Sequence, residues 1–217
     1  MKVKIFITFC IMIFGVITMQ ARHLKPLESD NGKISYKDEK EKATIQPKYE
    51  YVGDFYEGFA RVLLNKKWGF IDKTGKEVTP IKYDKVDNFS EGFAPVNLNK
   101  KWGFIDKTGK VVIPLKYDDA NIFSEGLAAI GINEKYGFIN QKGKEVISIK
   151  YDWADDFSEG FAVVKLNGKF GFIDKKGKVV IPFLYESAFP FKDGKAKVEK
   201  DGIEFFIDKK GKEIIED

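Results

Sequence analysis

The side chains that could do chemistry in this sequence are few, and most of them recur at a fixed spacing. The only histidine, His23, and the only cysteine, Cys10, both lie near the N-terminus. A histidine-activated nucleophile and a zinc site made of the usual histidine and cysteine ligands are therefore excluded from the rest of the chain. We predict no metal and no cofactor.

Carboxylates are the remaining candidates, because glycoside hydrolysis needs only a pair of them. A catalytic pair should be unique, whereas a turn residue should recur in every unit. The candidate glutamates recur, each before a glycine: Glu57, Glu91, Glu125 and Glu159. The turn at 72–75 and its copies offer one carboxylate each, too few oxygen ligands for calcium. We therefore predict no catalytic residues and no enzyme; a carboxylate hydrolase of an unrecognised type is the enzymatic alternative.

These residues belong to a unit of 34 residues that repeats along the chain. The stretch Lys66–Lys76 returns letter for letter at 100–110, and in altered form at 134–144, 168–178 and 202–212. Phe104, Ile105 and Gly109 each have a counterpart of the same type in all five copies. Agreement of this kind indicates that every unit solves the same packing problem.

A helical hairpin is one known repeat of this length, but glycine and proline argue against it. Gly92, Gly103 and Gly109 of the second unit would each cost ~1 kcal/mol inside a helix. Pro114, which lies in the same unit, would break a second helix. The sequence therefore predicts an all-β unit.

The second unit predicts a three-stranded meander. Apolar and polar residues alternate over 93–99, and a tight turn at Asn99-Lys100 leads to a return strand at 101–106. A second turn places Gly109 in the left-handed region before a third strand at 111–115. Gly103 has no side chain, which lets a neighbouring segment approach closely.

Stacked meanders can bury aromatic residues that one meander cannot. Both ends supply their own third strand, at Thr44–Pro47 and Lys212–Asp217, and the last unit carries Glu204-Phe205 in place of a Trp-Gly pair. A polar end suits a solvent-facing cap. We predict tandem three-stranded meanders in an open, curved array, with a five-bladed, propeller-like closure as the alternative.

The N-terminus has the pattern of a secretory signal. Lys2 and Lys4 precede an apolar run at Ile5–Ile17, which is too short to span a bilayer. We predict a signal peptide at 1–21, a flexible polar linker at 22–42 and a repeat domain at 43–217. The protein is then exported to a periplasm, to the cell surface or outside the cell, and no stable membrane span remains. Removing the two lysines lowers the net charge from +4 to +2, which gives no case for nucleic acid.

The repeat resembles the WG-repeat family, also called KWG repeats, of bacterial proteins. The resemblance rests on Lys67–Asp72, Lys101–Asp106, the preceding Ser90–Ala94 and the following Val112–Pro114, and it covers about Ala43–Asp217. It implies an all-β repeat without catalytic residues. Ser148 departs from the pattern, at a proline position. The structural motif positions are Trp68, Gly69, Trp102, Gly103, Tyr136, Gly137, Phe170 and Gly171, and Tyr136 and Phe170 replace the tryptophan.

Function should lie where the units differ. The position two residues after the repeat tyrosine varies, holding Tyr51, Lys85, Asp119, Trp153 and Ser187. We predict that Trp153 and Tyr51 are surface aromatics and that Asp155 and Asp156 accept hydrogen bonds from a sugar or peptide. In the alternative reading, Trp153 fills a local gap in packing. The chain is interpreted as an exported, non-enzymatic scaffold for an unidentified protein or cell-envelope component, or alternatively as a glycan or cell-wall binding module.

Overall fold

The fold is a row of small antiparallel sheets. The computed structural model describes residues 25–28, 34–37 and 43–215, and the signal peptide expected at 1–21 lies outside them. We call the sheets after the first one blades 1 to 5. The N-terminal sheet contains β1 (Lys25–Glu28), β2 (Ile34–Lys37) and β3 (Ala43–Tyr49). Blade 1 contains β4 (Tyr51–Tyr56), β5 (Phe59–Leu64) and β6 (Lys67–Asp72).

The four remaining blades share one strand order, in which consecutive strands are neighbours. Blade 2 contains β7 (Lys85–Val86), β8 (Phe93–Leu98), β9 (Lys101–Asp106) and β10 (Val111–Tyr117). Blade 3 contains β11 (Asp119–Ala120), β12 (Leu127–Ile132), β13 (Lys135–Asn140) and β14 (Glu145–Tyr151). Blade 4 contains β15 (Trp153–Ala154), β16 (Phe161–Leu166), β17 (Lys169–Asp174) and β18 (Val179–Tyr185). Blade 5 contains β19 (Ser187–Ala188), β20 (Lys195–Lys200), β21 (Ile203–Asp208) and β22 (Glu213–Ile214).

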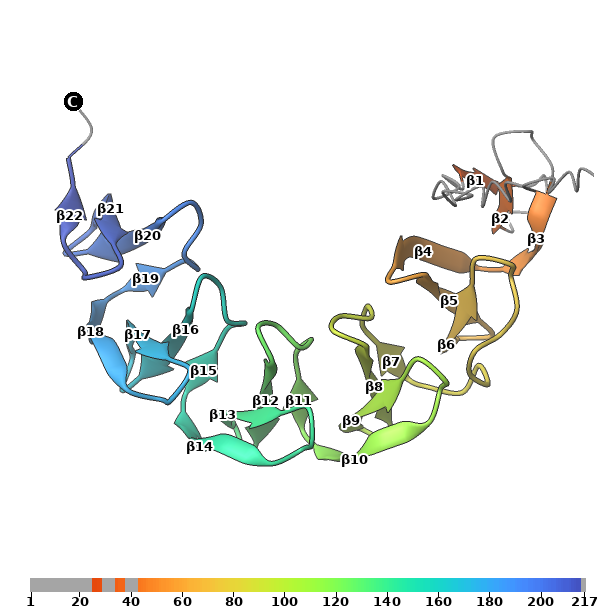
Figure 1. The fold of residues 1–217 in the computed structure, drawn as a ribbon, viewed down its shortest axis with the longest axis horizontal. Coiled ribbons are helices and arrows are strands. Elements are labelled where there is room, and N and C mark those ends of the chain that lie inside the picture. Colours follow the sequence, from red (N-terminus) through yellow and green to blue (C-terminus); the bar gives the residue numbers. More distant parts are fainter. Residues whose placement is uncertain (1–24, 29–33, 38–42, 216–217) are drawn as a thin grey trace, which may run out of the picture.

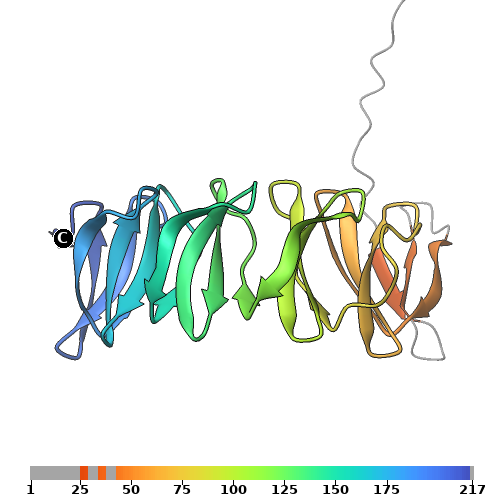
Figure 2. The same cartoon turned by 90° about the horizontal axis from the view of Figure 1, so that it is seen from below.

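The blades form an open arc, as the sequence predicts, and the two ends of the arc lie well apart (Figure 1). The array therefore does not close into a five-bladed ring. The third strands β10, β14 and β18 lie along the convex outer rim, whereas the two-residue strands β7, β11, β15 and β19 lie at the opposite edge of each sheet (Figure 1). The long strands run from one flat side of the arc to the other (Figure 2). No helix among the described residues is long and apolar enough to cross a membrane.

The turns have the predicted geometry. Asn99 and Lys100 have φ angles of +53° and +63°, the pair of left-handed residues that a type I′ hairpin requires. Gly109 has φ +82°. A Cβ added to Gly103 would lie 2.5 Å from the carbonyl oxygen of Ile113, so the third strand does approach this glycine closely.

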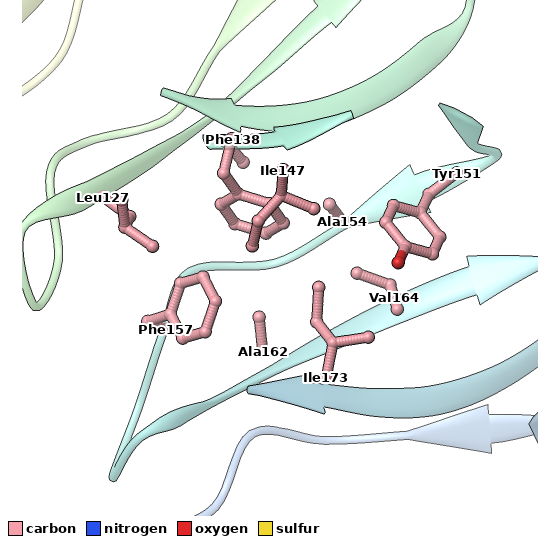
Figure 3. Packing of buried hydrophobic residues seen from close by; sticks show 10 residues of the cluster. Leu127, Phe138, Ile147, Tyr151, Ala154, Phe157, Ala162, Val164 and Ile173 are labelled. Carbon is pink, nitrogen blue, oxygen red and sulfur yellow. The ribbon is translucent and has the colours of Figure 1, made fainter. Parts of the chain in front are cut away.

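The core lies between blades rather than inside any one of them. Leu127, Phe138, Ile147 and Tyr151 of blade 3 pack against Ala154, Phe157, Ala162, Val164 and Ile173 of blade 4 (Figure 3). The rings of Phe138 and Phe157 stand 4.9 Å apart, centroid to centroid, in an edge-on arrangement. Each buried leucine, isoleucine, valine or phenylalanine of this cluster contributes roughly 1.5–3 kcal/mol. Because the cluster spans two blades, neither blade buries these side chains alone. Stacking is therefore what stabilises the unit.

The structure differs from the sequence prediction in three places. Part of the linker expected at 22–42 forms strands β1 and β2, which pair with β3, so the array begins earlier than residue 43. Blades 2 to 5 contain a fourth, two-residue strand in the segment that was expected only to cross between meanders. Blade 1 lacks a regular third strand; there the backbone N–H of Phe70 donates to the hydroxyl of the buried Thr79 instead.

Candidate functional site

The recurring glutamates join neighbouring blades. Glu91, Glu125 and Glu159 lie in loops that follow two-residue strands, and Glu57 lies in the turn between β4 and β5. The loops after the two-residue strands face the concave side of the arc (Figure 1), and we call them the concave loops: residues 87–92, 121–126, 155–160 and 189–194. Glu125 accepts a hydrogen bond from the backbone N–H of Gly160 in the next blade, at 3.1 Å. It also forms an ion pair of 2.9 Å with Lys175. Glu57 and Glu159 repeat both contacts, and Glu91 meets Gln141 in place of a lysine.

The protonation of these glutamates follows from their contacts. Burial acts to raise the pKa of Glu125, but the Lys175 ammonium and the Gly160 N–H outweigh it and hold the pKa below its usual range. The same balance lowers the pKa of Glu57, and Lys209 is the main cause of the lowered pKa of Glu159. These carboxylates are ionised and engaged with the neighbouring blade, an arrangement that favours a structural role.

Two further rows of contacts cross the blade boundaries. The hydroxyl of Ser124 donates to the carbonyl of Phe157 at 2.7 Å, and Ser90 and Ser158 make the equivalent bond. The Lys135 ammonium meets Asp152 at 2.6 Å, which lowers the pKa of that carboxyl. Equivalent pairs join Lys67 with Asp84, Lys101 with Asp118, and Lys169 with Glu186. These recurring charges thus serve the joints of the array.

The position that varies between units packs against the motif tryptophan or its replacement. Trp153 stands edge-on to Phe170, with ring centroids 5.8 Å apart, and remains 38% exposed. Tyr51 meets Trp68 in the same way at 5.5 Å and is 41% exposed. Both aromatics therefore pack on their own blade while keeping accessible surface. The structure does not bring Tyr51 and Trp153 together, because they belong to blades 1 and 4 (Figure 1).

Asp155 and Asp156 follow β15 and begin a concave loop. Asp155 accepts a hydrogen bond from the Asp156 backbone N–H at 2.9 Å. Burial raises the pKa of Asp156 to about 6, and the carboxylates of Asp155 and Asp87 raise it further, whereas a hydrogen bond from the Asn121 side chain opposes the rise. One carboxylate oxygen of Asp156 is buried and has no partner among the described residues.

Sequence reasoning missed the companions of Asp156. Asp87 of blade 2 forms an ion pair of 3.2 Å with Arg61 of blade 1, and Asn121 belongs to blade 3. Residues of blades 1 to 4 thus interact pairwise, Arg61 with Asp87 and Asn121 with Asp156. A sequence signal exists, because the position of Asp155 also varies from unit to unit, holding Gly53, Asp87, Asn121 and Phe189 in the others. No group of three or more histidine, cysteine, aspartate or glutamate side chains suited to a metal ion occurs among the described residues.

The C-terminal end of the array presents charge where the other blades present apolar surface. Lys197 pairs with Glu204 at 2.7 Å, and the Lys195 ammonium lies 4.6 Å from the centre of the Phe206 ring. The equivalents of Lys195 in blades 2 and 4 are Phe93 and Phe161. Charged residues thus occur in this blade as predicted for a cap, although Phe189 and Ile203 of the same blade are also exposed.

Comparisons with known proteins agree with the repeat architecture. The family described as "WG containing repeat" matches five consecutive segments, residues 34–68, 68–102, 102–136, 136–170 and 170–202. No curated protein matches the chain in sequence.

Among solved structures, a crystal structure of "the eukaryotic initiation factor" is similar with a TM-score of 0.58 and 11% identity over 90% of this chain. Hsv2 of Kluyveromyces lactis is similar with a TM-score of 0.50 and 11% identity over 82% of this chain. The chain spans 63% and 66% of these two structures, respectively. The similarity is one of fold, and it is propeller-like.

Proposed function

Because this chain belongs to the family of WG-containing repeat proteins, we propose that it is an exported, non-enzymatic scaffold that binds a protein partner. One observation carries the proposal. Recurring charged side chains such as Glu125 and Lys135 are engaged in contacts between blades, whereas Tyr51 and Trp153, at a position that differs between units, remain accessible. An array of this kind offers a broad, rigid surface rather than a catalytic pocket.

Export is proposed from the N-terminal sequence. Lys2 and Lys4 before the apolar run Ile5–Ile17 have the order of charges and apolar residues that a secretory signal needs. The partner is then a protein of the cell envelope or of the surroundings. Fusing residues 1–24 to a reporter enzyme that is active only after export would test this step; a reporter that stays inactive would contradict it.

The scaffold function is tested by capture from a cell-envelope fraction. The bait is immobilised protein from Arg22 to Asp217, the form that export would leave, and the control bait carries charge-reversing substitutions on its exposed variable positions. We expect discrete proteins on the first bait and their loss on the second. Equal recovery on both baits, or none on either, would contradict the proposal.

A glycan or cell-wall binding module is the second candidate, and the exposed indole of Trp153 favours it. Sugar rings pack against aromatic faces, and Trp153 keeps 38% of its surface accessible. Retention on insoluble polysaccharide should then be lost in Trp153→Ala and kept in Tyr51→Ala. Equal retention of both variants would remove Trp153 from this role, and eluates that contain sugar without protein would favour this candidate over the first.

A further inference from the structure

The rim strands differ in one residue that matters for pairing. In β10 and β18 the middle of the strand carries Pro114 and Pro182, whereas β14 carries Ser148 at the same place. The three strands pair with their neighbours in the same register. In each, an isoleucine opposes a phenylalanine of the preceding strand: Ile113 opposes Phe104, Ile147 opposes Phe138 and Ile181 opposes Phe172. Ser148 therefore occupies the position of a proline in an otherwise unchanged strand.

The backbone N–H of Ser148 is not needed for pairing within its own sheet. A Cβ built on Gly137 of β13 would lie 2.5 Å from the carbonyl oxygen of Ile147 and 2.8 Å from the nitrogen of Ile149. The backbone on both sides of Ser148 thus lies against Gly137. Ser148 itself has no opposing residue in the register of β13, and Pro114 and Pro182 at the same position show that the sheet does not need an N–H there. Pro114 has the same surroundings over Gly103 and functions without an N–H.

An outer edge with a free N–H can accept another strand, and proline removes that capacity. β14 is a seven-residue rim strand without proline, and Ser148 has no opposing residue in the register of β13. Val146 is 42% exposed, and Ser148 and Lys150 are exposed beside it. The edge thus combines a backbone donor and acceptor with accessible apolar and basic side chains.

The charge beside this edge is mainly positive. Lys144 and Lys150 are exposed at the two ends of β14, and Lys110 and Lys116 flank the neighbouring rim strand in the same way. Glu145 is the one carboxylate within β14. We propose that β14 is a docking edge for an extended, acidic segment of a partner protein, which adds as a strand beside β14 and bonds the N–H and C=O of Ser148.

The added strand is short. Between Ile147 and Tyr151 three residues of β14 face a single residue of β13, so the rim strand is bulged there. A bulge limits the length over which a second strand remains in register. The contact is consequently one of the small, reversible kind. It rests on the proposed scaffold function and names the chemistry of the partner.

The test exchanges serine and proline between blades in the full chain. The probe is a fluorescently labelled peptide in which glutamate and valine alternate, and anisotropy measures its binding. Ser148→Pro should weaken binding about tenfold or more, because it removes a backbone donor and places a ring at the edge. Pro114→Ser should add a second binding site in blade 2. Both variants should keep the melting temperature, because each residue already occurs at that register in this chain.

Each other outcome overturns the proposal. Equal binding by the wild type and Ser148→Pro, or no binding by the wild type, removes β14 as the docking edge. Equal binding of a peptide in which lysine replaces glutamate removes the acidic partner. A wild type that dimerises in sedimentation, with a monomeric Ser148→Pro variant, assigns the edge to a second copy of the chain.

The failure of this inference is distinguishable from failure of the scaffold function. Envelope proteins captured equally by the wild type and Ser148→Pro overturn the docking edge and leave the scaffold intact. Capture of no protein by either contradicts the scaffold itself.

Discussion

Replacing Asp156 with asparagine should stabilise the protein at neutral pH and remove one component of its pH dependence. The carboxyl is largely buried on the concave side, and burial raises its pKa from the usual aspartate range to about 6. At neutral pH the folded protein therefore holds an ionised group in surroundings that favour the neutral form. Asparagine keeps the shape and the capacity to bond Asn121, and it carries no charge.

The magnitude follows from the pKa. The rise is about two units, and each unit corresponds to ~1.4 kcal/mol, so the ionised carboxylate costs about 3 kcal/mol at most. Removing the charge also ends its repulsion with Asp155 and Asp87. We expect Asp156→Asn to raise the free energy of unfolding by about 1–3 kcal/mol at pH 7, which is about 2–4 °C in melting temperature per kcal/mol.

The pH dependence has a definite sign. Because the pKa of Asp156 is higher in the folded state than in the unfolded chain, the folded state takes up its proton first as the pH falls. The stabilising contribution is lost as the pH rises through about 6 and is fully present below about 4. The advantage of Asp156→Asn over the wild type should therefore shrink steadily between pH 7 and pH 4.

Urea unfolding of the wild type and Asp156→Asn across this pH range measures the difference between their free energies of unfolding. The titration of all other groups affects both proteins equally and cancels in this difference. Asp152→Asn is the control of opposite sign, because Lys135 lowers the pKa of Asp152; it should destabilise at neutral pH, and its effect should fade in acid. An Asp156→Asn variant with the stability of the wild type at every pH would refute the reasoning.

Three further predictions concern packing and the joints between blades. Gly109→Val should lower the free energy of unfolding by more than ~1 kcal/mol relative to Gly92→Val in thermal melts. Both glycines have positive φ, but only a Cβ at position 109 would lie 2.5 Å from a carbonyl oxygen. Equal losses would mean that only the φ angle matters. Glu125→Gln should lower the free energy of unfolding by about 0.5–1 kcal/mol in urea, and Glu91→Gln should lower it less, because Glu125 has a lysine partner and Glu91 a glutamine. A larger loss in Glu91→Gln would contradict the role of the Glu125–Lys175 ion pair in joining the blades. Trp153→Ala should lower the free energy of unfolding by about 1 kcal/mol and Trp153→Phe by less, because the indole packs on the ring of Phe170. An unchanged melting temperature in both variants would show that Trp153 has no packing role.

Sequence reasoning succeeded wherever one residue's conformation decides the structure. Asn99-Lys100 predicts its hairpin because both residues take positive φ, and Gly109 predicts its turn for the same reason. Gly103 predicts close approach because only a missing side chain admits the backbone of Ile113. Such signals are local and recur in every unit, so a single correct reading gives the whole array. The added third strand expected at Thr44–Pro47, from its likeness to the third strand of the repeat, is confirmed within β3.

The remainder depends on neighbours in space. A two-residue strand such as β11 shows no alternation in sequence, and it exists because β12 offers a free edge beside it. The strands β1 and β2 lie in a polar stretch, where composition favoured a linker. The meeting of Asp87 with Asp156 depends on the curvature of the arc across three blades, and no single unit encodes that curvature.

Departures from the repeat therefore carry the information about function, once the structure shows what each departure does. Trp153 replaces smaller or polar residues at its position and covers Phe170, itself a replacement of the motif tryptophan, so these two changes compensate within blade 4. Asp156 raises the cost of folding and has no compensating ion pair among the described residues. Ser148 leaves the register of its sheet unchanged, because β10 and β18 pair in the same register with proline at this position. A departure that compensates another is explained by packing. One that adds a free donor at an accessible edge has no role in packing, and binding is the role that its position allows.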